Sequence, residues 1–142
     1  YVCAPKEVLD QILKIQQYIM LSAPTQAQYG AIAALDECIP DMEMMVEEYH
    51  KRRDFLLVSF KELGIDCSNA GGAFYVFPSI KKFNMPSREI CLKLLNEYNV
   101  LVVPGTAFGD TGEGYIRVSY AANMEKLKIF IDALKDLRNH MC

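Results

Sequence analysis

Residues 114–121 read Gly114-Tyr115-Ile116-Arg117-Val118-Ser119-Tyr120-Ala121 and predict a short strand. The run is rich in β-branched and aromatic residues, which favour strands, and it holds one arginine at its centre. A buried charge without a partner is strongly unfavourable, whereas arginine can bind a carboxylate through two parallel hydrogen bonds. Arg117 is therefore expected to be either a structural ion-pair partner or a clamp for a carboxylate ligand.

The residues around this strand predict a sheet covered by helices. A turn at residues 69–72 leads into a strand over residues 73–78, and Pro104-Gly105 ends an apolar strand over residues 100–103. The other predicted elements are a helix over 86–98, a polar loop over 106–113 and a helix over 123–138. The order strand, helix, strand, strand, helix predicts an α+β fold, with a small mixed β-sheet and helices on one face.

Three helices are predicted ahead of this sheet. Apolar residues recur at helical spacing over residues 6–20, 25–38 and 41–63. Gly64 follows the third helix, in the position where a glycine commonly ends one. Much of the apolar surface of the first two helices has no evident partner in the chain, so we expect the chain to self-associate.

The composition predicts a globular protein and argues against several classes of function. Hydrophobic residues make up 51% of the 142 residues and charged residues 23%, while the net charge of −3 offers no basic face for a nucleic-acid partner. No apolar run is long enough to span a membrane, so no membrane partner is expected. The five cysteines form no CxxC pair, which argues against a disulfide framework or a metal site and favours reduced thiols in a cytoplasmic protein.

Five segments, in order along almost the whole chain, resemble the signatures of the fold-type I aminotransferases, the class I and II family that includes aspartate and aromatic aminotransferases. Tyr1-Val2-Cys3-Ala4-Pro5 is similar to the family segment that follows the cofactor lysine. The other four segments are Ser22–Gln28, Gly72–Tyr75, Val103–Gly109 and Ile116–Ala121. Each segment is weak by itself, but all five in the family's order make a strong resemblance.

This resemblance implies roles for particular residues. Arg117 would bind the α-carboxylate of the substrate, and Phe108 and Gly72 would be further substrate-binding residues near the same cleft. Ser22 and Tyr18 match a region that, in related dimers, approaches the cofactor site of the neighbouring subunit. No catalytic residue is expected within this chain, because the lysine that forms the Schiff base with pyridoxal phosphate should precede Tyr1.

The resemblance also implies how the chain fits into a larger enzyme. Residues 1–40 would be a remnant of the large cofactor-binding domain, residues 41–63 a linking helix, and residues 64–142 the C-terminal small domain. The full-length enzyme would use pyridoxal 5'-phosphate to transfer an amino group between an amino acid and a 2-oxo acid, and it would be a homodimer. The chain alone is expected to bind no cofactor and to be inactive.

Two alternatives remain open at this stage. Other fold-type I enzymes, such as carbon–sulfur lyases or cyclopropane-forming synthases, share the carboxylate-binding arginine. A non-catalytic module that binds a carboxylate or dimerises is the second alternative. A reading frame that continues upstream of Tyr1 through a lysine would favour the enzyme, and a start codon near Tyr1 would favour the module.

Overall fold

The computed structural model describes residues 1–140, and the chain divides into two compact units. The first unit holds residues 1–44, with helices α1 (Lys6–Ile19) and α2 (Thr25–Asp36). Helix α3 (Ile39–Glu62) begins in the first unit and continues into the second, which starts at Met45. The three predicted helices are therefore confirmed, with ends within about two residues of those expected.

The two helices of the first unit have no buried residue. Helix α1 begins after Pro5, ends at Ile19 with Met20 as its C-cap, and carries an exposed ion pair of 2.7 Å between Lys6 Nζ and Asp10 Oδ2. An exposed pair one helical turn apart adds only a few tenths of a kcal/mol to helix stability. Most helices in proteins are stabilised chiefly by packing of an apolar face. Helices α1 and α2 bury no residue within this unit, so they do not have this stabilisation there.

The second unit contains a three-stranded sheet with the strand order β1-β3-β2. Strand β3 (Ile116–Ser119) pairs through its second half with β1 (Tyr75–Val76) and through its first half with β2 (Val103–Pro104). The paired strands β1 and β2 have two residues each and are shorter than the predicted strands. Strand β2 shares only Val103 with the strand predicted over residues 100–103, because Pro104 pairs with Ile116 instead of ending the strand. The remaining elements are η1 (Lys81–Phe83), α4 (Ser87–Tyr98), η2 (Gly105–Phe108), η3 (Asp110–Gly112) and α5 (Met124–Asn139).

The α+β fold is confirmed, but the sheet is antiparallel rather than mixed. Both pairings of β3 are antiparallel. Helix α4 connects β1 to β2, and a strand–helix–strand connection commonly joins parallel strands. The strands β1 and β2 do run in the same direction, because each is antiparallel to β3. Strand β3 lies between them and runs against both, which leaves no parallel neighbours in the sheet.

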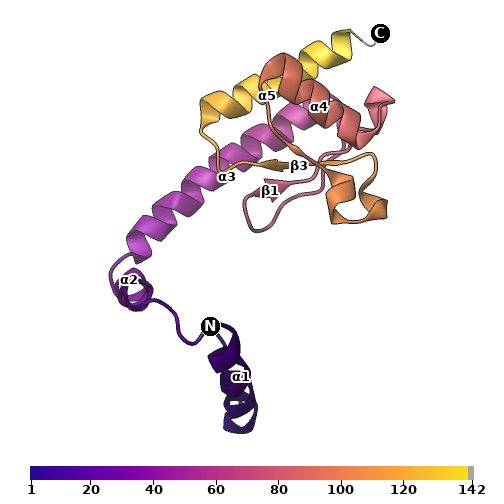
Figure 1. Ribbon diagram of the computed structural model, residues 1–142. Helices are drawn as coiled ribbons and strands as arrows, with labels where there is room; N and C mark the ends of the chain where they lie inside the picture. The colour runs from indigo at the N-terminus through magenta and orange to yellow at the C-terminus, as the bar shows by residue number, and fades with distance from the viewer. Residues whose placement is uncertain (141–142) are drawn as a thin grey trace. The chain divides into compact units, whose positions relative to one another are not determined.

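The helices pack on one face of this sheet. Figure 1 shows α4 and α5 together on one side of β1 and β3. The face of the sheet that they cover contributes Val76, Ile116 and Val118, all buried. The helices contribute further buried apolar residues, among them Phe60 and Phe130, whose rings meet edge to face at 6.2 Å.

A hydrogen-bonded carboxylate ties the start of α4 to the segment before β3. The backbone N–H and the hydroxyl of the fully buried Ser87 donate to Glu113 Oε1 at 2.8 and 3.0 Å, and the N–H of Gly114 donates to Ser87 Oγ at 2.8 Å. The bond from the Ser87 N–H is the main cause of a lowered pKa of Glu113. An anion at a helix N-terminus also interacts favourably with the helix dipole, so Glu113 holds the η2–η3 segment against α4.

Helix α5 begins at a conventional cap, because the Asn123 side chain accepts a hydrogen bond of 3.0 Å from the N–H of Lys126. Within residues 1–140, none of the helices is both long and apolar enough to cross a lipid bilayer. The same residues contain no cluster of three or more His, Cys, Asp or Glu side chains arranged to hold a metal ion.

Candidate substrate-binding site

The strand that carries Arg117 has one buried face and one open face. Ile116 and Val118 point into the core, while Arg117 is half-buried and Ser119 is exposed. This alternation is the ordinary period of two of a strand, so Arg117 lies on the face of the sheet that the helices leave uncovered. Its cross-strand partner is Val103, and Ser119 lies opposite Tyr75.

Arg117 contacts aromatic rings rather than a carboxylate. The guanidinium carbon Cζ lies 4.3 Å from the centre of the Tyr75 ring and 4.5 Å from the centre of the Phe108 ring. Both distances are well within the range of a cation–π interaction. None of the ion pairs within residues 1–140 includes Arg117, so the structural ion-pair role left open by the sequence finds no partner there.

A second layer of aromatic residues supports Phe108. Phe77 meets Phe108 edge to face at 5.8 Å and stacks on Tyr115 at 6.0 Å. Lys81 Nζ lies 4.8 Å from the centre of the Tyr115 ring and 3.4 Å from its hydroxyl oxygen. The site therefore holds a continuous row of side chains, from Tyr75 through Arg117, Phe108 and Phe77 to Tyr115.

The loop that positions Phe108 depends on close backbone contact. Gly105 follows β2 and donates its N–H to the Tyr115 carbonyl oxygen at 2.8 Å. A Cβ at Gly105 would collide with the Gly112 carbonyl oxygen, and one at Gly112 would collide with the Gly105 carbonyl oxygen. Two glycines at this contact let the short helices η2 and η3 pack together, which places Phe108 beside Arg117.

The structure brings only two of the predicted site residues together. Arg117 and Phe108 are in contact. Gly72 instead lines a separate hollow of about 200 Å3, together with Tyr49, His50 and Tyr120. Space is open around the Gly72 Cα, with nothing within 4 Å of the position that a Cβ would take. The substrate-binding role of Gly72 therefore stays a prediction.

The two residues predicted to lie near a cofactor belong to the first unit. Tyr18 is in the last turn of α1 with 93% of its side chain exposed, and Ser22 is exposed in the connection between α1 and α2. Neither forms a side-chain hydrogen bond that would fix its orientation among the contacts of the described residues. Their cofactor-binding role stays a prediction.

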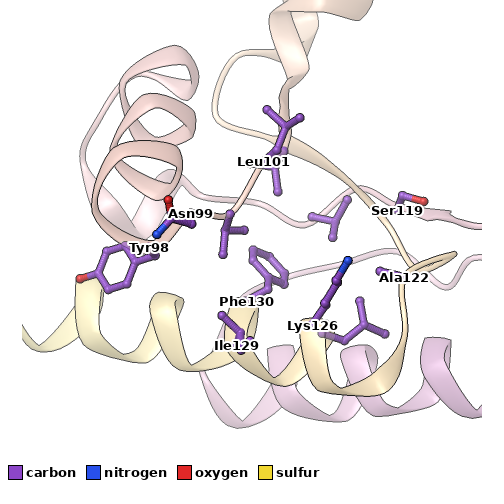
Figure 2. Close-up of a pocket in the computed structure, with 12 residues that line it drawn as sticks. Tyr98, Asn99, Leu101, Ser119, Ala122, Lys126, Ile129 and Phe130 are labelled. Carbon is purple, nitrogen blue, oxygen red and sulfur yellow. The ribbon is translucent and has the colours of Figure 1, made fainter.

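A larger hollow of about 590 Å3 lies elsewhere in the second unit, between the end of α4 and the start of α5. Figure 2 shows its lining, with Leu101 on one side and Ile129 and Phe130 on the other, and with the Lys126 side chain extending toward the space between them. Arg117 is not among the residues that line it. We place the candidate site at Arg117, because its guanidinium has no ionic partner within residues 1–140 and cavity size alone does not identify a site.

Tyr75 is the residue of the site that sequence reasoning missed. The strand over residues 73–78 was predicted, but its aromatic residues were not assigned to a face. The alternation of side chains along an extended segment could have indicated the role of Tyr75. Tyr75 is two residues before Phe77, and both lie on the opposite side from the buried Val76. Only the pairing of β1 with β3 shows that this side faces Arg117.

The site can bind a planar anion but lacks groups for pyridoxal phosphate. That cofactor needs a lysine amine beside its aldehyde and a cluster of donors for its phosphate. The one lysine in the aromatic row, Lys81, is directed at the Tyr115 ring. The residues around Arg117 thus fit a substrate carboxylate and do not fit the cofactor itself.

An antiparallel sheet backed by helices, with a half-buried arginine on its open face, defines a small α+β unit. Comparison with known proteins identifies its relatives. The family described as aminotransferase class I and II matches residues 1–134. The chain belongs to this family.

Proteins similar to this chain carry aminotransferase names. It is 39% identical over 140 residues to the (5-formylfuran-3-yl)methyl phosphate transaminase of Methanocaldococcus jannaschii, covering 98% of this chain and 37% of that protein. It is 38% identical over 137 residues to the aspartate aminotransferase of Pyrococcus abyssi, covering 95% of this chain and 35% of the relative. The chain thus spans about a third of the length of the curated relatives it matches.

Solved structures give the same result for the fold. The crystal structure of an aromatic aminotransferase from Pyrococcus horikoshii OT3 matches 97% of this chain with a TM-score of 0.90 and 34% sequence identity. The match covers 38% of that protein. The family resemblance inferred from the five sequence segments is therefore confirmed.

Proposed function

We propose that this chain is the C-terminal part of a pyridoxal-phosphate-dependent aminotransferase that exchanges an amino group between an amino acid and a 2-oxo acid. The observation that carries the proposal is the environment of Arg117. Its guanidinium lies on the open face of the sheet, between two aromatic rings and without a carboxylate partner in residues 1–140. Family membership supports the reaction class, and relatives named for aspartate and aromatic substrates support an amino-acid substrate.

In this reaction the chain's own residues bind and orient the substrate. The planar fork of Arg117 donates two parallel hydrogen bonds to the α-carboxylate, which fixes both the position and the tilt of the amino acid. The rings of Tyr75 and Phe108 each lie against the guanidinium and shield part of it from solvent. Pyridoxal phosphate, held by the rest of the enzyme, supplies the electron-withdrawing group that the amino transfer requires.

The remaining assignments complete the proposal. Residues 1–40 belong to the large domain, residues 41–63 form the linking helix, and residues 64–142 form the small domain. Ser22 and Tyr18 lie near the cofactor of the neighbouring subunit in a cytoplasmic homodimer, and Gly72 lies at the cleft. The exposed apolar side chains of α1 and α2 support an assembly in which other parts of the enzyme cover them.

The test is Arg117→Lys in the full-length protein, assayed with L-aspartate, L-alanine, L-phenylalanine and L-tyrosine as donors and 2-oxoglutarate as acceptor. Lysine keeps the charge but cannot form the two-pronged bond, so we expect kcat/KM to fall about 30-fold or more, equivalent to about 2 kcal/mol. Arg88→Lys is the matched control, because Arg88 is an exposed arginine on α4 that belongs to no ion pair within residues 1–140. An Arg117→Lys enzyme as active as this control with every donor would refute the clamp.

A further inference from the structure

Two rings hold the Arg117 guanidinium, one from each neighbour of its strand. Tyr75 is in β1, and Phe108 is in η2, directly after β2. The order β1-β3-β2 places β3 between these two elements. The rings therefore approach Arg117 from two sides, with their centres 4.3 and 4.5 Å from the Cζ atom.

This arrangement restrains the side chain without occupying its donors. The five N–H groups of a guanidinium can each donate a hydrogen bond, whereas the negative face of an aromatic ring attracts the positive charge of the group as a whole. Neither Tyr75 nor Phe108 has a carboxyl group, so neither competes with a carboxylate ligand for the guanidinium of Arg117. An arginine in this setting has lost much of its rotamer freedom before any ligand arrives.

We propose that Tyr75 and Phe108 are positioning residues that hold the Arg117 fork in the orientation required by the substrate carboxylate. The inference rests on the proposed function of Arg117 as a carboxylate clamp. It names the side chains that fix the orientation of the Arg117 guanidinium. Tyr75 belongs to no predicted set of site residues. Phe108 is a predicted substrate-binding residue, and its contact with Arg117 supports a positioning role in addition.

The second layer of rings supports this role. Phe108 is 51% exposed, so its own burial restrains it weakly. The edge of Phe77 packs against it at 5.8 Å, and Tyr115 stacks on Phe77 from the other side at 6.0 Å. Phe74 contacts the Tyr75 ring at 4.6 Å in a similar way. Each ring beside Arg117 is therefore itself held by a further aromatic side chain.

The experiment measures binding of a carboxylate that cannot react. In the full-length enzyme loaded with pyridoxal phosphate, the probe is 3-phenylpropionate, which has no amino group, and its Kd is measured by calorimetry. Tyr75→Leu and Phe108→Leu keep an apolar side chain but remove the ring. We expect each to raise the Kd about 3- to 30-fold, the effect of losing one partly desolvated cation–π contact.

Conservative variants and a matched control variant distinguish a positioning role from a general loss of structure. Tyr75→Phe and Phe108→Tyr retain a ring and should keep the Kd within about 2-fold of the original, in line with small effects of conservative changes. Tyr98→Leu makes the same chemical change in the same unit at a ring that does not contact Arg117, and it should leave the Kd unchanged. The absorbance of bound pyridoxal phosphate checks that each variant is folded.

The deciding measurement repeats both leucine variants in the Arg117→Lys background. If the rings act through Arg117, adding Tyr75→Leu or Phe108→Leu to the Arg117→Lys enzyme should change its Kd by less than about 2-fold. Such non-additivity is expected of coupled residues. Equal changes in both backgrounds would overturn the inference, because the rings would then contact the ligand directly. An unchanged Kd for both leucine variants with Arg117 present would overturn it as well.

Failure of the proposed function gives a different result. If Arg117→Lys alone leaves the Kd of 3-phenylpropionate unchanged, Arg117 does not bind the carboxylate, and the positioning role falls with it. If Arg117→Lys weakens binding while the leucine variants match Tyr98→Leu, the clamp stands and only the positioning role is wrong.

Discussion

Gly105→Ala should disturb the site through the backbone rather than through a side chain that touches Arg117. Its added methyl group would collide with the Gly112 carbonyl oxygen and lie 2.9 Å from the Tyr115 carbonyl oxygen. Both are backbone atoms, and the Tyr115 oxygen is already fixed by the hydrogen bond from the Gly105 N–H. The loop must therefore shift, and overpacking of this kind costs about 1–3 kcal/mol. The same shift should alter the contact between Phe108 and Arg117, whose ring centre and Cζ atom are 4.5 Å apart.

Urea unfolding of the 142-residue chain, followed by circular dichroism at a helical wavelength, measures the first effect. With a slope of about 2 kcal/mol per molar urea, a loss of about 2 kcal/mol lowers the midpoint by roughly 1 M. Gly71→Ala is the matched control, because nothing lies within 4 Å of its added Cβ and its φ is not in the left-handed region. Equal midpoints for Gly105→Ala and Gly71→Ala would refute the argument from close backbone contact.

Two further predictions concern pH and assembly. The lowered pKa of Glu113 means that its contribution to stability is present above the ordinary value of 4.5 and is lost as the pH falls through the lowered pKa. Glu113→Gln should therefore unfold at lower urea than the original at pH 7 and show no such difference at pH 2, as midpoints measured at both values would test. The exposed apolar residues of α1 and α2, such as Tyr18, Ile19 and Leu35, predict self-association. Sedimentation velocity at increasing concentration should show a rising weight-average mass, and a constant monomer mass would contradict the prediction.

The helices were predictable because local rules determine them. Apolar residues at helical spacing, the proline before each of α1, α2 and α4, and Asn123 at the start of α5 all lie within one or two turns of the helix they specify. The ends agree with the structure to within a few residues. Strands β1 and β3 lie within the predicted segments but are shorter than them. The strand predicted over residues 100–103 shares only Val103 with β2, because Pro104 pairs with Ile116 instead of ending the strand. The bounds of a strand depend on which residues find a partner in another part of the chain.

The residues of the candidate site also differ in whether the sequence alone could identify them. Arg117 could be recognised because an arginine in a short apolar strand is unusual in itself. Tyr75 could not, because 42 positions separate it from Arg117 and nothing near it in the sequence shows that β1 and β3 pair. The absence of an ionic partner for Arg117 in residues 1–140 was likewise invisible until the positions of the acidic side chains were known.

The sequence by itself determined the α+β class, the order of the elements, the family, and the arginine most suited to hold a carboxylate. Each of these follows from local periodicity or from short motifs. Only the tertiary structure decided that β3 lies between β1 and β2, that the sheet is antiparallel, and that Tyr75 and Phe108 meet at Arg117. The physical reason is that strand pairing joins residues far apart in the chain, and the free energy that selects one pairing comes from the core that the whole unit buries.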